Sequence, residues 1–304
     1  MEISKLEFLK KCEICPHKCK IDRTKNQIGR CKSKDTVKVA KISIHKFEEP
    51  CISKINGSGT VFFSNCNLNC VFCQNYEISQ NGLGEEITID ELADMFIKLQ
   101  DKNANNINLV TPTSYVPQII EAIKKAKSKG LTIPIIYNTN SYENIETLKL
   151  LDGYIDIYLP DLKYAEDELA LNLSKIDNYF EIATNAVKEM YRQVGDLECD
   201  EDGIAKKGMI IRHLVIPNHI ENSKKVLKWI KTNMPHNTYI SIMNQYFPTY
   251  KAKDIDELNR KLTKREIKKI EDFIYSLDFT NGYIQDLEEN EVQYVPNWRD
   301  VTIL

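Results

Sequence analysis

Six short apolar runs, each of strand length and separated by segments with helical spacing, constrain the fold of this chain most. Thr88 and Thr263 each precede a glutamate by three residues, as in a capping box, and Ile267, Ile270 and Ile274 then recur at helical spacing. Strands that alternate with helices build a parallel sheet. The sequence therefore predicts an α/β protein of six βα units, a partial (βα)6 barrel open on one side rather than a closed eight-unit barrel. The predicted strands lie at 60–64, 107–111, 133–137, 154–160, 209–217 and 238–244.

The size of the chain and its hydrophobic content set the number of domains. With 304 residues and 42% hydrophobic content, the chain can bury one large α/β core and a small appendage. No apolar run approaches the roughly eighteen residues of a membrane span. The N-terminus, Met-Glu-Ile-Ser-Lys, has no apolar signal segment. We therefore expect a cytoplasmic protein without a membrane partner.

The formal net charge of -3 hides a basic N-terminal arm. Residues 1–41 hold 12 Lys and Arg against 5 Asp and Glu, a net of +7, which leaves -10 for the rest. Such an arm could meet nucleic acid or an acidic protein surface. Phe8 is the only aromatic residue of this arm, which argues against stacking on nucleic-acid bases. The favoured interpretation is that the lysines keep a small metal-bound module soluble.

Three cysteines, Cys66, Cys70 and Cys73, follow the first predicted strand with C-x3-C-x2-C spacing. A 4Fe-4S cluster usually takes four thiolates, so a local trio leaves one iron open for a substrate or cofactor. Zinc is the alternative, since three thiolates plus a histidine or a distant cysteine would close a tetrahedron. A zinc knuckle normally pairs two C-x2-C elements, and no second pair follows here, so the pattern favours the cluster.

A second group of cysteines, Cys12, Cys15, Cys19 and Cys31, lies within twenty residues near the N-terminus. Four thiolates so close together predict a closed metal site. Zinc and a second, auxiliary iron-sulfur cluster both fit, and the spacing does not separate them. We therefore divide the chain into a cysteine-rich metal-binding module, residues 1–50, and a barrel with a C-terminal extension, residues 51–304.

The whole chain resembles the radical SAM (S-adenosylmethionine) superfamily, and within it the branch related to pyruvate formate-lyase activating enzyme. The aromatic Phe72 completes the pattern C-x3-C-x-aromatic-C. The resemblance implies a radical SAM partial barrel in which SAM binds the open iron and is reductively cleaved to a 5′-deoxyadenosyl radical that abstracts hydrogen. It also implies an electron donor such as flavodoxin or ferredoxin. The other segments that carry it are His45-Lys-Phe-Glu-Glu-Pro, Gly57-Ser-Gly-Thr-Val-Phe-Phe-Ser, Tyr158-Leu-Pro-Asp-Leu-Lys-Tyr, Glu189-Met-Tyr-Arg-Gln-Val-Gly and Arg212-His-Leu-Val-Ile-Pro.

The resemblance assigns cofactor-binding roles to the ends of the second and third strands. Thr111-Pro-Thr113 stands where activating enzymes carry a Gly-Gly-Glu that holds the SAM amino group, so the glycines and the acid are missing here. Thr111 and Thr113 could still accept hydrogen bonds from an ammonium group, with a smaller charge contribution. Asn138-Thr-Asn140 resembles the Asp-Thr-Asn-Gly run of the activating enzymes, which makes Asn138 and Asn140 further candidates for SAM.

The fourth and fifth strands supply the candidate catalytic residues. Asp161-Leu-Lys163 matches the D-x-K motif of activating enzymes. The resemblance implies that Asp161 lies near the SAM carboxylate or a monovalent cation, and that Lys163 is a charge partner near the reacting centre. Arg212 and His213 are neighbours on a strand, so only one of them can face the barrel interior.

Three hypotheses for the function remain open. The first is an enzyme that activates a glycyl radical enzyme, and the second is a radical SAM enzyme that modifies a small metabolite or a peptide. A wide mouth would favour the first, and a closed pocket with directed polar groups the second. The third is a non-catalytic iron-sulfur or zinc-binding protein or an electron carrier, which the missing Gly-Gly-Glu alone supports.

Overall fold

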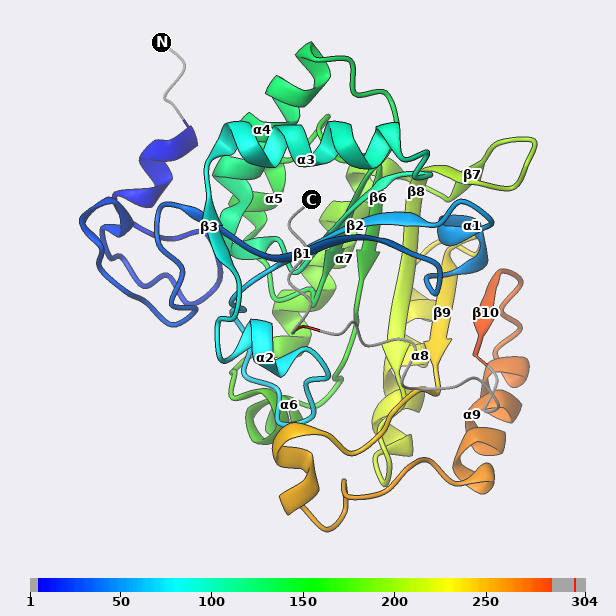
Figure 1. Cartoon of the computed structure of the whole chain (residues 1–304). Coiled ribbons are helices and arrows are strands. Elements are labelled where there is room, and N and C mark those ends of the chain that lie inside the picture. The colour runs from blue at the N-terminus through cyan, green and yellow to red at the C-terminus, as the bar shows by residue number, and fades with distance from the viewer. Residues whose placement is uncertain (1–4, 286–297, 299–304) are drawn as a thin grey trace.

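The computed structural model describes residues 5–285 and residue 298. In this part of the chain ten strands form one sheet, in the order β10-β9-β8-β6-β5-β4-β2-β1-β3, and β7 pairs with β8 (Figure 1). The strands are β1 (Val37–His45), β2 (Ser58–Phe63), β3 (Glu85–Ile87), β4 (Ile107–Val110), β5 (Ile135–Thr139), β6 (Ile157–Pro160), β7 (Glu198–Cys199), β8 (Ala205–Leu214), β9 (Tyr239–Met243) and β10 (Gly282–Ile284).

The six strands predicted from the sequence are the parallel ones at the centre of the sheet. β2, β4, β5, β6, β8 and β9 pair with one another in parallel. Every residue of β2, β4, β5 and β6 is buried, as expected for strands that are covered on both faces. Among the described strands β3 and β10 end the sheet without pairing with each other, so the barrel is open. The predicted partial barrel is confirmed.

The helices pack around this sheet (Figure 1). Both predicted capping boxes are present, with Thr88 capping α3 and Thr263 capping α9. The helices are α1 (Pro50–Ser53), α2 (Tyr76–Ser79), α3 (Ile89–Asp101), α4 (Val116–Ser128), α5 (Ile145–Leu150), α6 (Asp167–Ser174), α7 (Tyr179–Val194), α8 (Ile220–Asn233) and α9 (Lys264–Ser276).

The sheet extends beyond the predicted strands at both ends. β1 runs antiparallel to β2, and β3 runs antiparallel to β1. β10 pairs in parallel with β9. The predicted domain boundary at residue 50 stays a prediction, but β1, which precedes it, is hydrogen-bonded to the first strand of the barrel. The ends of the second predicted domain, 286–297 and 299–304, lie outside the described residues.

Gly208 shows how closely the chain packs where β8 begins. Its φ is +112°, and a Cβ placed on it would lie 2.2 Å from the carbonyl oxygen of Asp196 and 2.5 Å from the Cα of Leu197. Both are backbone atoms, which cannot swing aside as a flexible side chain can. Only glycine fits at this position without a shift of the backbone.

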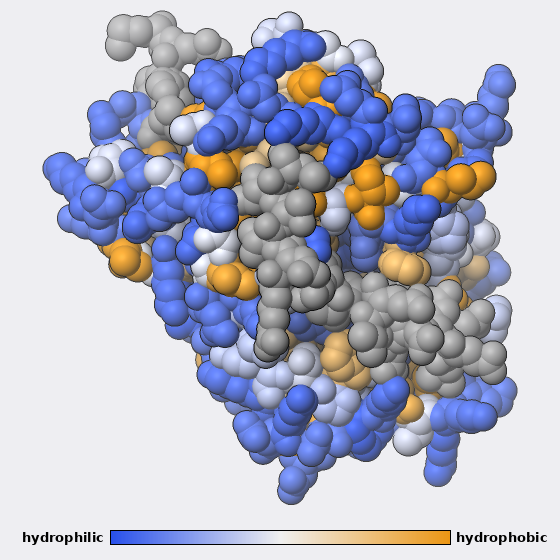
Figure 2. Space-filling model, viewed as in Figure 1, coloured by the Kyte–Doolittle hydropathy of each residue, from blue (hydrophilic) through white to orange (hydrophobic). Residues whose placement is uncertain are grey.

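The described residues on the face in Figure 2 are largely hydrophilic, with apolar residues scattered among them. In the described part of the chain no helix has both the length and the apolar character needed to cross a membrane.

Candidate active site

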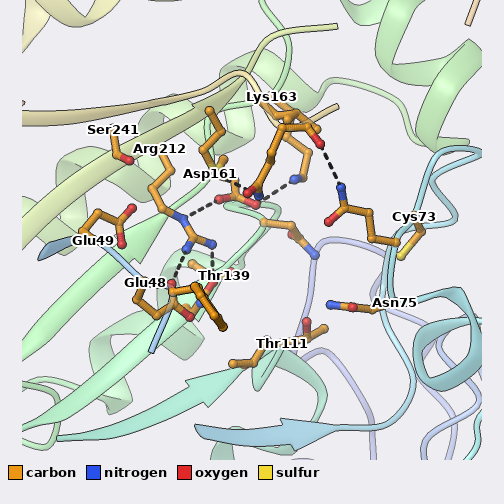
Figure 3. Close-up of a pocket in the computed structure, with 18 of the residues that line it drawn as sticks. Glu48, Glu49, Cys73, Asn75, Thr111, Thr139, Asp161, Lys163, Arg212 and Ser241 are labelled. Carbon is orange, nitrogen blue, oxygen red and sulfur yellow. Dashed lines mark hydrogen bonds and ion pairs between the residues drawn. The ribbon is translucent and has the colours of Figure 1, made fainter. Parts of the chain in front are cut away.

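One large cavity, of about 910 Å³, opens at the carboxyl ends of the parallel strands. All three cysteines of the C-x3-C-x2-C motif line it, because the loop that carries them follows directly after β2. Figure 3 shows Cys73 of this loop at the cavity. Barrel enzymes place their chemistry at this end of the strands. The polar residues of the strand ends that share the lining are Thr111, Asn138, Thr139, Asn140, Asp161, Lys163 and Arg212.

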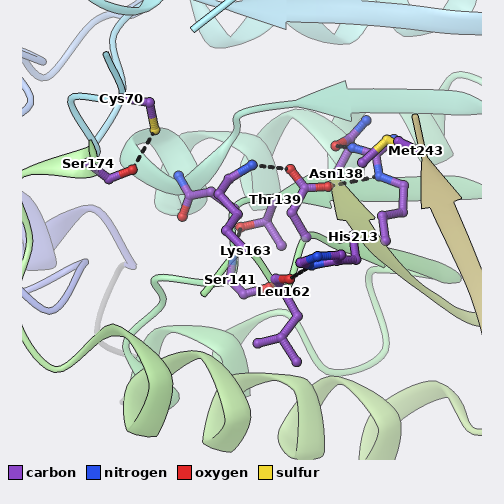
Figure 4. Close-up of polar contacts among 12 residues, drawn as sticks. Cys70, Asn138, Thr139, Ser141, Leu162, Lys163, Ser174, His213 and Met243 are labelled. Atoms are coloured by element: carbon purple, nitrogen blue, oxygen red, sulfur yellow. Dashed lines mark hydrogen bonds and ion pairs between the residues drawn. The ribbon is translucent and has the colours of Figure 1, made fainter. Parts of the chain in front are cut away.

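Each thiol of the trio has hydrogen-bonding neighbours. The Cys66 sulfur accepts from the backbone N–H of Leu68, at 3.4 Å, and from the amide of Asn140, at 3.5 Å. The Cys70 sulfur lies 2.9 Å from the Ser174 hydroxyl, as Figure 4 shows. The Cys73 sulfur lies 3.2 Å from the hydroxyl of Ser79. Hydrogen bonds to sulfur are one of the means by which proteins tune iron-sulfur clusters.

The chemistry of the trio fits a bound cluster. Burial raises the pKa of the Cys70 thiol to about 11. The thiol is therefore protonated at neutral pH unless a metal takes the place of the proton. A 4Fe-4S cluster takes thiolate ligands on several irons, and three thiols that line one cavity are a donor set that fits it.

Arg212 is the centre of a buried charge network at the strand ends. Its Nε donates to Asp161, at 2.9 Å, its Nη1 to Glu48, at 3.2 Å, and its Nη2 to Asn138, at 2.6 Å (Figure 3). Lys163 donates through Nζ to the other carboxylate oxygen of Asp161, at 2.7 Å. The network ties together the ends of β5, β6 and β8.

Mutual pairing keeps the two candidate catalytic residues charged. Burial alone would raise the pKa of Asp161, but the cations of Lys163 and Arg212 outweigh it and hold that pKa below its ordinary value. Burial likewise works to lower the pKa of Lys163, yet the neighbouring Asp161 carboxylate outweighs it and raises that pKa. Asp161 and Lys163 therefore form a buried pair with only 15% and 14% of their side chains exposed, not a surface pair.

The structure brings most of the predicted SAM-binding residues to the cavity, but not Thr113. Thr113 is buried in the turn that precedes α4, and its hydroxyl donates to the Glu143 carboxylate at 2.6 Å. The hydroxyl of Tyr137 donates to the same carboxylate oxygen at 3.2 Å. Thr111, with a φ of +60°, stays on the cavity wall. The prediction that Thr113 contacts the cofactor finds no support in its position.

Two residues of the site, Glu48 and Glu49, were not among the predicted site residues. Glu48 accepts from the amide of Asn108, at 3.0 Å, as well as from Arg212. Glu49 is 8% exposed and precedes Pro50, the first residue of α1. Both lie between β1 and β2, outside the predicted strands, so a search of strand ends does not find them. The signal that could have found them is the pair of acids directly before a proline.

His213 faces away from the cavity, as the alternation with Arg212 predicts. It has no exposed surface, and its ring nitrogens lie 2.6 Å from the Leu162 carbonyl and 2.9 Å from the Ser223 hydroxyl (Figure 4). Burial lowers the pKa of His213 to about 4, from its ordinary value of 6.5. His213 is therefore a neutral residue of the core that joins β8 to α8.

The low pKa of His213 predicts acid sensitivity. The unfolded chain binds a proton at this residue below pH 6.5, whereas the folded chain does so only below about pH 4. Stability is thus complete above pH 6.5 and falls by about 3 kcal/mol as the pH decreases to about 4. Urea unfolding at pH 5 and pH 7.5 should show a smaller loss for His213→Gln than for the wild type. An equal loss in both proteins would contradict the assignment.

The four N-terminal cysteines lie together around a small pocket of their own. Their module contacts the barrel next to the first cysteine of the trio, since His17 Nε2 lies 2.8 Å from the carbonyl oxygen of Asn67. Arg23 is buried and donates to the Ser114 carbonyl, at 2.7 Å. The amide of Asn144 donates to the Glu13 carbonyl, also at 2.7 Å. Whether the four thiols bind zinc or an auxiliary cluster stays a prediction.

A partial parallel barrel with three cysteines at the carboxyl ends of its strands is the arrangement expected of an iron-sulfur barrel enzyme. The model of the radical SAM superfamily matches residues 60–258, more than half of the 304 residues, and the chain belongs to this superfamily. The family implies a 4Fe-4S cluster and SAM as cofactors, and through them the chemistry of the 5′-deoxyadenosyl radical.

Two curated proteins are similar to the chain over most of its length. One is the uncharacterized protein MJ0674 of Methanocaldococcus jannaschii, 34% identical over 297 residues, which cover 94% of this chain and 79% of that protein. The other is the pyruvate formate-lyase-activating enzyme of Clostridium pasteurianum, 24% identical over 258 residues, which cover 77% of this chain and 97% of the enzyme.

Among solved structures, HydG, a maturase of the FeFe-hydrogenase, aligns with a TM-score of 0.51 and 15% identity. The alignment covers 75% of this chain and 52% of HydG. This likeness concerns the fold alone. The chain spans about half the length of the first solved structures that it matches, 47% in the case of SuiB from Streptococcus suis.

Proposed function

We propose that this chain cleaves SAM reductively at a cluster held by Cys66, Cys70 and Cys73, and that it abstracts a hydrogen atom from a substrate bound in the same cavity. The observation that carries the proposal is that the three thiols and the polar strand ends line one cavity. Its volume of about 910 Å³ is near the upper end of ordinary ligand pockets, about 300–1,000 Å³, so it has room for SAM and a second molecule.

When bound, the cofactors would supply the difficult step, a carbon radical reactive enough to abstract hydrogen. The chain's own residues bind and orient. Asn140 donates to the Cys66 sulfur and to Asn67, at 2.8 Å, and so fixes the loop that holds the cluster. Thr111 and Asn138 present polar groups along the wall where the SAM amino acid moiety would lie.

Asp161 and Lys163 complete the binding surface for SAM. Because Lys163 keeps its proton, its ammonium can attract a carboxylate, and the ionised Asp161 can attract an ammonium group or a monovalent cation. In this arrangement the Asp161 carboxylate, at the end of β6, would attract the SAM amino group. In activating enzymes the Gly-Gly-Glu motif, at the position of the β4 end, holds this group.

For the substrate, the similarity to the Clostridium activating enzyme and the Asp161-Leu-Lys163 motif favour activation of a glycyl radical enzyme. A second candidate is modification of a small metabolite or a peptide. The buried charges of Glu48, Glu49 and Arg212 favour it, because a pocket with directed polar groups suits a substrate held at several points.

The test is the formation of 5′-deoxyadenosine by anaerobic, cluster-reconstituted protein given SAM and a strong reductant. The wild type should form it and Cys70→Ala should not, because Cys70 is a proposed cluster ligand. Cys199→Ala is the matched control, since Cys199 is an exposed cysteine far from the trio in sequence, and it should act like the wild type. If the wild type forms no nucleoside with a full iron content, the proposed function is wrong.

A further inference from the structure

Glu49 is the acid of the buried charge network that forms no direct ion pair among the described residues, although it lies within the electrostatic reach of Arg212. All three nitrogens of Arg212 donate to other residues, and Lys163 donates to Asp161. The Ser241 side chain lies close enough to Glu49 to help lower its pKa. One carboxylate oxygen of Glu49, Oε2, is buried and has no hydrogen-bond partner among the described residues. A buried carboxylate oxygen without a donor costs free energy that a ligand could recover.

The charges around Glu49 do not balance. Three carboxylates, those of Glu48, Glu49 and Asp161, face two enclosed cations, Arg212 and Lys163, so the set carries one surplus negative charge when all five are ionised. One further cation, on Lys46, lines the same cavity, but its side chain is exposed to solvent. Burial raises the pKa of Glu49 by more than the nearby Arg212 cation lowers it. A proton on Glu49 would remove the charge but would still leave Oε2 without a partner.

The position of Glu49 separates it from the cysteines. In Figure 3 Glu49 and Ser241 lie on one side of Arg212, and Cys73 lies on the opposite side of the cavity. Lys163 and Asp161 lie between them. SAM would occupy the side of the cysteines, so a molecule that reaches Glu49 is a second occupant of the cavity. Glu49 therefore belongs to the substrate side.

We propose that Glu49 binds a cationic nitrogen, an ammonium or guanidinium group, carried by the substrate. This proposal rests on the proposed function and deepens it by naming the chemistry of the second ligand. Such a group donates a hydrogen bond to Oε2 and also supplies the missing positive charge. A neutral amide would satisfy the hydrogen bond but not the charge, and charge-assisted hydrogen bonds are roughly twice as strong as neutral ones.

A cationic nitrogen can come from the side chain of a peptide segment or from a free amine, and two matched pairs of probes distinguish these sources. The peptide pair is acetyl-Gly-Arg-Gly-amide and the same peptide with neutral citrulline in place of arginine. The small-molecule pair is n-butylguanidinium and n-butylurea. Calorimetric titrations of the full, reconstituted chain with SAM present should show about tenfold tighter binding of the charged member in at least one pair.

Variants of Glu49 assign this preference to the carboxylate. Glu49→Gln should reduce the preference for the charged probe to near unity, because the amide keeps the shape but removes the charge. Glu49→Asp should retain part of it, which shows that the loss does not come from misfolding. Glu221→Gln is the control, since the Glu221 side chain is 75% exposed on α8, and it should keep the full preference.

Two results would overturn the inference. One is that the wild type binds no charged probe more tightly than its neutral counterpart. The other is that the preference persists in Glu49→Gln. The formation of 5′-deoxyadenosine in the same preparations separates the two proposals. If the wild type forms the nucleoside but does not discriminate between probes, this inference alone fails, and if it forms none, the proposed function fails.

Discussion

Replacement of Arg212 by methionine is expected to lower the free energy of unfolding by about 3–5 kcal/mol. The guanidinium holds the carboxylates of Asp161 and Glu48, and its own side chain is only 12% exposed. Methionine leaves both acids in the cavity with one cation fewer. The midpoint of urea-induced unfolding of the cluster-free protein measures the loss.

Arg192→Met is the matched control for this experiment. Arg192 also pairs with two acids, Asp152 and Glu189, but its side chain is 55% exposed. Solvent-exposed ion pairs contribute about 0–1 kcal/mol, so the control should unfold nearly as the wild type does. Arg212→Lys should fall between the two, since it keeps the charge but not the geometry of the three donors. Equal losses in Arg212→Met and Arg192→Met would show that the buried network does not stabilise the fold.

The second large effect is expected from Gly208→Ala, at the beginning of β8. The new methyl group would collide with the backbone of Asp196 and Leu197, and the φ of +112° is itself unfavourable for alanine. Overpacking and backbone strain each cost about 1–3 kcal/mol. We therefore expect a total loss of about 2–6 kcal/mol in urea unfolding.

Gly195→Ala separates the collision from the backbone strain. Gly195 also has a positive φ, +72°, but nothing lies within 4 Å of its missing Cβ. Only the strain of its backbone conformation remains there, with a ψ of -154° that is essentially confined to glycine, about 1–3 kcal/mol. A loss in Gly208→Ala no greater than in Gly195→Ala would show that the segment between α7 and β7, which holds Asp196 and Leu197, can move away from the methyl group.

The sequence predicts the parallel core of the fold well because its strands are buried on both faces. Runs that are mostly apolar, such as Ile-Pro-Ile-Ile-Tyr at 133–137, result from that burial and are readable without a structure. β1 alternates polar and apolar residues because it lies at the antiparallel side of the sheet, and its partner is not evident from its own pattern. β10 has three residues, too few for a periodic signal.

The sequence predicts those residues of the candidate site that lie at the ends of the parallel strands, but not the others. Asn138, Asn140, Asp161 and Lys163 reach the cavity because carboxyl ends of parallel strands meet at one edge. Thr113 fails this rule because the chain turns into a short helix and gives its hydroxyl to Glu143. Tertiary contacts, not local pattern, decide such positions, and their assignments to SAM and substrate stay predictions.

The pairing of β1 with β2 has a consequence for the modularity of the protein. β1 covers the edge of the first barrel strand over the register from Val39 to His45, and the acids of the cavity follow it in the chain. A barrel expressed from residue 51 onward would present an unpaired strand edge, which favours aggregation, and would lack Glu48 and Glu49. The cysteine-rich module, residues 1–50, therefore cannot be exchanged as a unit. Any exchange of the N-terminal cysteines must leave residues 37–49 attached to the barrel.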